Sequence, residues 1–341
     1  MSEKTGVAVL GGPASGKTTY MGALVRALEG NKLAHLELRS LPEEATAYGR
    51  LSSPLSKLQY PQRTKAERHN LELPLRAKRG ETTEDISLLM GDYDGEEVER
   101  LFKNRNQGFS EEWRARAHAA GMLLLVRPNA LTPLPRLRIA DELSDRERLL
   151  ALKASSTPAK RPRVVARAHD DPETAFGTGI QDEPNEPRVA APTDAVQVPT
   201  VLAVIELLQF LRHERGLSPG ERPKPGSLRI ALMASAWDAV DITWQRKGAQ
   251  AFFAEHAPLL REFLWSNHLR EDIMFFGLSS TAGDLHDPEY KKAYRRKPHG
   301  YVEWADITGH IQRSKNLALP IEWALFGDEA FARTDKEEVH S

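Results

Sequence analysis

The sequence contains no cysteine among its 341 residues. Disulfide bridges, thiolate zinc sites and cysteine nucleophiles are therefore excluded, and the composition is compatible with a reducing compartment. Long apolar runs are also missing, since none approaches the roughly 18 residues that a membrane-spanning helix needs. The chain enters its first predicted strand within a few residues, which leaves no room for a secretion signal. We expect a cytoplasmic protein without membrane contact.

An excess of one charge is missing as well. The 47 lysines and arginines balance 48 acidic residues, which gives a net charge of −1. This balance argues against a nucleic-acid partner. The sharpest basic cluster, residues 291–297, is interpreted as a solvated helical face rather than a nucleic-acid-binding surface. Hydrophobic residues make up 40% of the chain, which is enough for a substantial core.

A glycine-rich segment near the start matches the pattern G-x-x-x-x-G-K-[ST] without a mismatch. Its residues are Gly11, Gly12, Pro13, Ala14, Ser15, Gly16, Lys17 and Thr18. Residues 6–10 predict a buried strand before the loop, and residues 18–28 predict an amphipathic helix after it. In this setting the loop N–H groups and the helix N-terminus bind phosphate oxygens. Lys17 is expected to reach the β- and γ-phosphates, Thr18 to bind Mg²⁺, and Thr19 to complete the nucleotide site.

Strand and helix patterns alternate through most of the chain. Residues 70–77 and 86–90 predict an antiparallel hairpin. Buried strands are predicted at 121–126, 228–234 and 273–278, and helices at 96–119, 201–214, 250–269 and within 306–326. We therefore expect a three-layer α/β/α fold of the P-loop NTPase type, with a mostly parallel sheet and one antiparallel edge strand.

The domain organisation follows from a shift in composition. Residues 153–199 are rich in proline and charge and poor in large apolar side chains. We interpret them as an insertion or linker, and a packed loop held by partner contacts is the alternative. Residues 1–152 and 200–330 are then the two parts of a single domain, and 331–341 form a polar tail.

Four further motifs follow the glycine loop, in a fixed order. They are Pro61-Gln62-Arg63-Thr64, Asp92-Tyr93-Asp94-Gly95-Glu96, Ser235-Ala236-Trp237-Asp238 and Ser279-Ser280-Thr281-Ala282-Gly283. The last three follow predicted buried strands. An Asp-Gly hairpin turn is the simple alternative for the second motif.

These motifs resemble those of P-loop GTPases of the translation-factor and Ras-related class. The closer resemblance is to the bacterial double-GTPase group, which shows a G-K-T-T-Y start, a P-x-x-T switch and a D-x-x-G-E loop. The resemblance covers residues 6–285 apart from the insertion. It implies Mg²⁺ and GTP or GDP as ligands. It also implies a protein partner or effector, often in a defence or conflict system.

The resemblance implies a role for each residue around the γ-phosphate. Thr64 would complete the magnesium shell with Thr18, and Asp92 would hold Mg²⁺ through a water molecule. Gly95 would offer its N–H to the γ-phosphate, so that its loop senses that group. Glu96 stands where relatives carry a water-positioning Gln or His, and it is equally interpreted as the first residue of a helix. Lys17, Thr64, Gly95 and Glu96 form the predicted catalytic set.

The base-recognition motifs are less complete. Asp238 would accept hydrogen bonds from guanine, while Ala236 stands where the family carries a lysine. The alternative for Asp238 is a helix N-cap. Trp237 is interpreted either as a cover for the base or as a core residue. Ser279 and Ser280 belong to the loop expected to contact guanine.

Three alternatives remain open at this stage. Arg63 is either an in-chain arginine finger or part of a solvated basic loop. The whole domain is either a GTP-hydrolysing switch or a binding module with little turnover. A P-loop ATPase or kinase is the third possibility, with Arg105, Arg114 and Arg116 as candidate lid arginines.

Overall fold

The computed structural model describes residues 5–12, 14–30, 33, 35–40, 45–61, 69–79, 82–92, 111–131 and 199–331. All of them belong to one compact unit, which spans Met1–Pro133 and Val198–Ser341. The predicted insertion, 153–199, lies outside the described residues except for Pro199. Within the described part, no helix is both long and apolar enough to span a bilayer.

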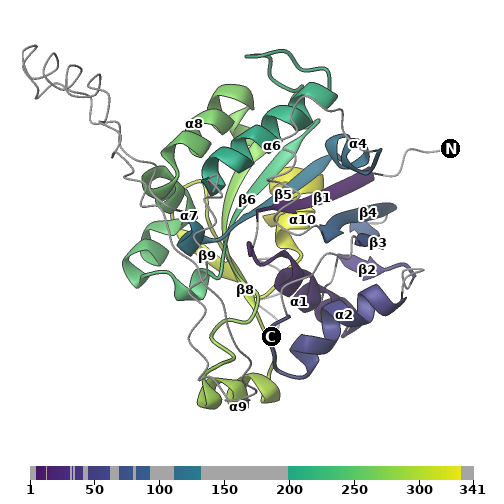
Figure 1. Cartoon of the computed structure of the whole chain (residues 1–341), viewed down its shortest axis with the longest axis vertical. Helices are drawn as coiled ribbons and strands as arrows, with labels where there is room; N and C mark the ends of the chain where they lie inside the picture. The colour runs from purple at the N-terminus through teal and green to yellow at the C-terminus, as the bar shows by residue number, and fades with distance from the viewer. Residues whose placement is uncertain are drawn as a thin grey trace, which may run out of the picture. The chain divides into compact units, whose positions relative to one another are not determined.

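One mixed sheet of nine strands organises the described residues (Figure 1). In spatial order the strands are β2 (Leu36–Leu38), β3 (His69–Arg79), β4 (Thr82–Asp92), β1 (Thr5–Gly11), β5 (Gly121–Val126), β6 (Arg229–Ser235), β7 (Ile273–Ser279), β8 (Tyr301–Ala305) and β9 (Ile311–Ser314). The five central strands pair in parallel, in the order β4, β1, β5, β6 and β7. Both flanks pair antiparallel.

The residue types explain this division of the sheet. β5 is buried along its whole length, and β6 and β7 nearly so, because helices cover both of their faces. β3 instead alternates, with Leu71, Leu73 and Leu75 buried and Glu72 and Arg76 exposed. One of its faces therefore packs on the core, and the other faces solvent.

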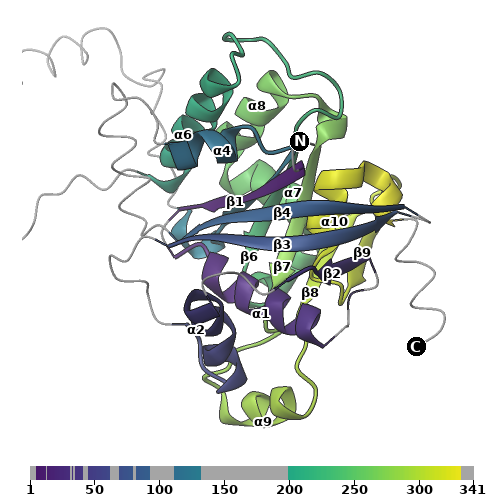
Figure 2. The same cartoon turned by 90° about the vertical axis from the view of Figure 1, so that its right-hand side faces the viewer.

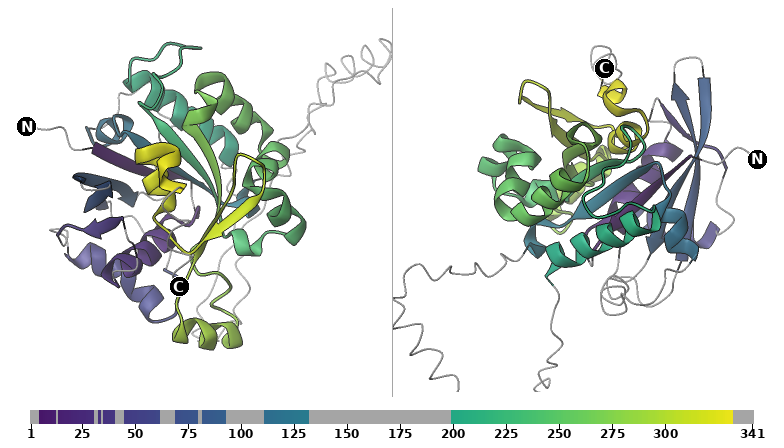
Figure 3. Two further views of the ribbon diagram at one scale, coloured as in Figure 1. Left: turned by 180° about the vertical axis from the view of Figure 1, so that it is seen from behind. Right: turned by 90° about the horizontal axis from the view of Figure 1, so that it is seen from above.

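Helices pack on both faces of the sheet in two hydrophobic clusters (Figure 2). One cluster contains α1 (Lys17–Glu29), α2 (Ala45–Ser56) and α10 (Leu319–Phe326). The other contains α4 (Glu111–Ala117), α6 (Thr200–Glu214), α7 (Ile242–His256) and α8 (Pro258–Asn267). Figure 3 shows α10 against the strands at the centre of the sheet.

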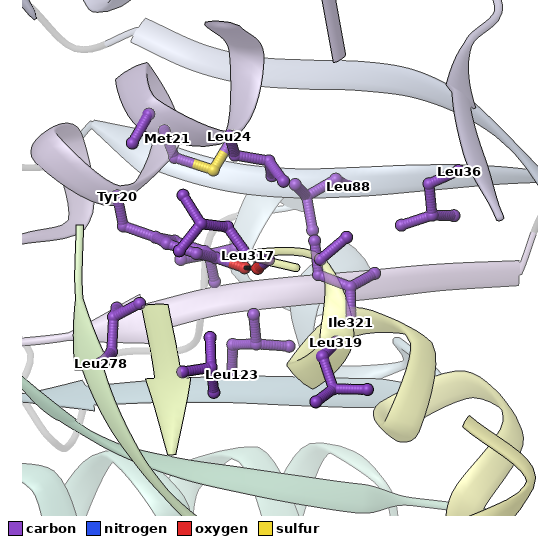
Figure 4. Packing of buried hydrophobic residues seen from close by; sticks show 14 of the residues in the cluster. Tyr20, Met21, Leu24, Leu36, Leu88, Leu123, Leu278, Leu317, Leu319 and Ile321 are labelled. Carbon is purple, nitrogen blue, oxygen red and sulfur yellow. Dashed lines mark hydrogen bonds between the residues drawn. The ribbon is translucent and has the colours of Figure 1, made fainter. Parts of the chain in front are cut away.

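The hydroxyl of Tyr20 links α1 to the chain just before α10. It donates a 2.9 Å hydrogen bond to the carbonyl oxygen of Leu317, inside a cluster that includes Met21, Leu24 and Leu123 (Figure 4). The aromatic ring and this bond hold the helix that follows the glycine loop against the C-terminal part of the sheet.

The α/β class and the hairpin of β3 and β4 are confirmed. The sheet is parallel only at its centre rather than through most of its strands, and the expectation of one antiparallel edge strand is wrong, because the β8–β9 hairpin makes the second edge antiparallel as well. The helix predicted within 306–326 is α10, which follows β9. The helix predicted at 250–269 is two helices, since Ala257 leaves helical geometry before Pro258.

Candidate functional site

The glycine loop connects β1 directly to α1. Ala14 and Gly16 both have positive φ angles, of 51° and 85°. This geometry turns successive N–H groups toward one concave side, which suits an anion. At Gly11, a Cβ atom would lie 2.5 Å from the carbonyl oxygen of Leu125 and 2.6 Å from Ser15 Oγ. Glycine is required there because β5 and the loop itself fill the space.

Lys17 is folded over the loop. Its Nζ donates to the carbonyl oxygens of Gly11 and Gly12, at 2.9 and 3.0 Å, and to Ser15 Oγ at 3.3 Å. The side chain is only 7% exposed. A buried ammonium group is costly unless oxygen acceptors surround it, and phosphate oxygens are such acceptors. The structure thus places Lys17 over the glycine loop, and its role toward phosphate stays a prediction.

The first turn of α1 is left open to an anion. Gly16 is its N-cap residue and makes no side-chain capping bond, and the first turn holds no acidic residue. The positive end of the helix dipole therefore favours a phosphate group at this turn. Thr18 and Thr19 lie in this turn, half-buried. Pro13 lies outside the described residues.

The end of β4 brings a carboxylate residue to the same edge of the sheet. β1 and β4 pair in parallel through Val9 and Met90, and two residues further on stand Gly11 and Asp92. Asp92 is described as strand backbone, and its side chain lies outside the described part. A threonine hydroxyl, one carboxylate and phosphate oxygens form a donor set that Mg²⁺ accepts. No three His, Asp, Glu or Cys side chains cluster as a metal site among the described residues, and this donor set does not need such a cluster.

The predicted switch residues cannot be placed. Thr64, Gly95 and Glu96 lie outside the described residues, and so does Arg63. Their roles stay predictions.

The candidate kinase arginines are engaged in packing where they are described. Arg116 is buried, with its guanidinium 4.8 Å from the centroid of the Trp113 ring. Arg114 lies 3.6 Å from Glu214 on α6. Arg105 falls outside the described part. The Arg114–Glu214 pair links α4 to α6, whereas the Arg116–Trp113 contact lies within α4.

Asp238 follows the end of β6, at the same edge of the sheet as the glycine loop. The hydroxyl of Ser279, at the end of β7, donates a hydrogen bond to Asp238 Oδ1. Ser235 lies beside the glycine loop, since a Cβ atom on Gly16 would be 3.4 Å from Ser235 Cβ. The structure thus brings the predicted base residues Asp238 and Ser279 together. Asp238 is three positions after Ser235, which lies next to Gly16 of the glycine loop. Asp238 makes no N-cap: the N-cap of α7 is Asp241.

Trp237 is a core residue and does not cover a base. Its side chain is fully buried, and its ring makes a T-shaped contact with Phe252 at 5.6 Å. The indole Nε1 donates to the buried carboxylate of Glu303 on β8, which also accepts from Arg313 on β9. Position 277 requires glycine, because the indole ring of Trp237 occupies the space that a Cβ atom would fill.

Two tyrosines that the sequence did not indicate contact the loop after β7, residues 279–285, which is called the base loop. The hydroxyl of Tyr290, on α9 (Pro288–Arg296), donates a 2.7 Å hydrogen bond to the carbonyl oxygen of Thr281. Burial, and then the charge of Asp238, raises the pKa of Tyr290 to about 12. Tyr60 reaches the same loop from the end of α2. Nothing in the local sequence around either tyrosine indicates this placement. Ser280 lies half-buried in the loop.

The fold and this loop define a P-loop nucleotide-binding protein of the α/β class. The family model named Double-GTPase 1 matches residues 8–324 of the chain, so the protein belongs to the double-GTPase 1 family. The resemblance seen in the motifs is confirmed. Membership of this family implies that the chain binds guanine nucleotides.

Two other comparisons add little. No curated protein matches the chain. A chain of the signal recognition particle receptor SRb-GTP/SRX complex from Chaetomium thermophilum has 12% sequence identity, with 87% of this chain and 98% of that chain covered. The TM-score is 0.33.

Proposed function

We propose that the protein is a Mg²⁺-dependent switch that binds GTP and hydrolyses its γ-phosphate. The observation that supports the proposal is that Asp238 follows β6 at the edge of the sheet that also carries the glycine loop. Ser235 packs at Gly16, and Asp238 follows three residues later, held by Ser279. A triphosphate on the loop would therefore direct its base toward a carboxylate, which accepts the two N–H groups of guanine and finds no such pair on adenine.

The chain's own residues supply most of the electrostatics in this proposal. Lys17 would exchange the carbonyl oxygens of Gly11 and Gly12 for phosphate oxygens, and the loop N–H groups would hold the remaining charge. Thr18, Thr64 and Asp92 would hold Mg²⁺, which when bound neutralises charge on the β- and γ-phosphates. Gly95 would sense the γ-phosphate and Glu96 would orient the attacking water.

Slow turnover and a partner protein belong to the same proposal. Hydrolysis by this kind of site is slow until extra positive charge reaches the γ-phosphate, and a partner or effector commonly supplies it. We propose such a protein partner here, working in the cytoplasm of a bacterial cell in a defence role. The support is the double-GTPase resemblance and, for the compartment, the absence of cysteine. We further propose that residues 153–199 are an insertion between the two parts of one domain, 1–152 and 200–330.

Nucleotide competition tests the proposal most directly. A fluorescent GDP analogue is displaced by GTP, GDP, ATP and ADP, each with Mg²⁺, and by GTP with a chelator. The proposal expects preference for the guanine nucleotides and weaker GTP binding after chelation. Lys17→Ala is expected to abolish binding. Equal or tighter binding of ATP would overturn the guanine assignment and favour a P-loop ATPase or kinase.

A catalytically weak GTP-binding module is the second candidate. It is favoured by Ala236, which stands in place of the family's base-covering lysine, and by the negative charge of Glu96 near the predicted γ-phosphate position. Single-turnover hydrolysis separates the two candidates. A switch converts bound GTP to GDP at a measurable rate that depends on Mg²⁺, whereas a passive module releases GTP intact.

A further inference from the structure

Tyr60 lies four residues after the end of α2, and the predicted switch follows it in the sequence. Leu58, two residues before it, has a positive φ angle of 58°, and this turn directs the following residues away from the helix. The half-buried ring of Tyr60 packs against the same hydrophobic cluster as α1 and α2. Pro61 is the last described residue of this segment, and Thr64 follows three positions later in the sequence.

The hydroxyl of Tyr60 binds the base loop rather than its own neighbourhood. It accepts a 3.0 Å hydrogen bond from the N–H of Leu285. Its single proton is shared between the carbonyl oxygen of Gly283 at 3.3 Å and Asp284 Oδ1 at 3.4 Å. Burial raises the pKa of Tyr60, so the hydroxyl keeps this proton at neutral pH. The ring also lies 5.2 Å from the ring of His286.

Three side chains from three elements therefore hold the loop after β7. Asp238 accepts from Ser279 at the start of the loop, and Tyr290 of α9 donates to Thr281. Tyr60 holds Gly283 and Leu285. Of the three, only Tyr60 belongs to the segment that continues into the predicted switch.

We infer that Tyr60 is a positioning residue that couples occupancy of the base site to the segment that leaves α2. A base at Asp238 would stabilise the loop of residues 279–285, and the Tyr60 hydroxyl would transmit this order to Pro61. Thr64 follows Tyr60 by four positions in the sequence, and the predicted switch therefore continues directly from the segment that Tyr60 holds. The inference rests on the proposed function, since it needs a nucleotide in the site.

Hydrogen exchange on the full chain tests the coupling without hydrolysis. In the wild-type protein, Mg²⁺ and GDP are expected to slow amide exchange both in residues 279–287 and in 45–61. In Tyr60→Phe, which keeps the ring and loses the hydroxyl, the base loop still responds and residues 45–61 do not. Tyr290→Phe is the matched control, because it removes a hydroxyl from the same loop and leaves both responses in place.

Each outcome decides something. If guanine nucleotide changes exchange nowhere in the wild-type protein, the proposed function is wrong and the inference falls with it. If the base loop responds while residues 45–61 do not, nucleotide binding stands and the coupling is overturned. The same holds if both segments still respond in Tyr60→Phe.

A kinetic measurement gives an independent readout. For Tyr60→Phe we expect the steady-state hydrolysis rate at saturating GTP (kcat) to fall about tenfold with little change in KM, because the lost contact acts on the switch rather than on binding. For Tyr290→Phe we expect the opposite, a raised KM with an unchanged rate. Equal effects of the two variants on the hydrolysis rate would contradict the inference.

Discussion

Ser279 donates a hydrogen bond to Asp238 across the ends of two neighbouring parallel strands. This bond occupies one carboxylate oxygen of Asp238 and fixes the direction of the other. The pair lies at the edge of the sheet where the glycine loop also lies. A carboxylate with one oxygen already held by a neighbour is pre-oriented for recognition of a ligand.

The first prediction concerns Asp238→Asn. The new amide can still accept from Ser279, but it cannot accept from both N–H groups of guanine. We expect the affinity for GTP to fall by about 10- to 100-fold, since hydrogen bonds to a charged group are each worth about 1.5–3 kcal/mol. Xanthosine triphosphate, whose C2 oxygen can accept from the amide, should bind the variant better than it binds the wild type. A titration with both nucleotides measures the change.

Asp241→Asn provides the matched control for that prediction. The Asp241 carboxylate caps α7 by accepting from the N–H of Thr243 at 2.7 Å, and asparagine caps a helix about equally well. GTP affinity should be unchanged in this variant. If Asp238→Asn binds GTP with the wild-type affinity, the assignment of Asp238 to the base site is wrong.

The second prediction compares two glycines of the loop. In Gly11→Ala, the new methyl group would meet the Leu125 carbonyl oxygen at 2.5 Å, whereas in Gly12→Ala it meets only Thr200 Cγ2 at 3.5 Å. We expect Gly11→Ala to lose nucleotide binding and to destabilise the protein by about 1–3 kcal/mol. Gly12→Ala should stay within about 0.5 kcal/mol of the wild type. Urea unfolding without nucleotide measures both, and similar unfolding of the two variants would contradict the loop geometry.

The sequence predicts those parts of the site whose signals are local. The glycine loop lies between one strand and one helix, so eight consecutive residues specify it. Asp238 and Ser279 could be placed at one edge in advance because each lies at or just beyond the end of a buried apolar strand, and parallel strands end at a common edge. The central sheet was predictable for the same reason.

Contacts between distant segments have no such signal. Tyr60 and Leu285 are 225 residues apart, and neither belongs to a recognisable motif. The β8–β9 hairpin was missed because its two strands are short and carry charged residues, including the buried Glu303. Its carboxylate is stabilised by Trp237 and Arg313, contacts that exist only after folding.

The third prediction tests the support behind Asp238. In Gly277→Ala, the added methyl group would lie 2.5 Å from Cδ1 and Nε1 of Trp237, the residue next to Asp238. We expect a stability loss of about 1–3 kcal/mol from overpacking, together with weaker GTP binding. Thermal unfolding and GTP titration measure the two effects.

Gly49→Ala is the control for overpacking. Nothing lies within 4 Å of its added methyl group, and the position is inside α2. This variant should gain up to about 1 kcal/mol, because alanine favours a helix interior more than glycine does. Unchanged GTP affinity in Gly277→Ala would show that Trp237 does not support the base site.

The fourth prediction concerns a buried histidine on the opposite side of the sheet from α1. The side chain of His268 is 1% exposed, and neither ring nitrogen has a hydrogen-bond partner among the described residues. Burial, and then the positive charges of Arg212 and Arg215, lowers the pKa of His268 to about 3. The folded protein therefore keeps this imidazole neutral where the unfolded chain would protonate it.

The sign of the pH dependence follows from the lowered pKa. Above pH 6.5, the ordinary pKa of histidine, the imidazole is neutral in both the folded and the unfolded chain, so it does not change the free energy of unfolding. As the pH falls from 6.5 toward 3, only the unfolded chain binds the proton, and the folded protein loses stability. The loss attributable to His268 should approach about 1.4 kcal/mol per pH unit at most. His268→Leu should unfold with a shallower pH dependence between pH 6.5 and 4.5, as measured by urea unfolding at each pH. His213→Leu, an exposed histidine on α6, should follow the wild type, and identical slopes for all three proteins would contradict the prediction.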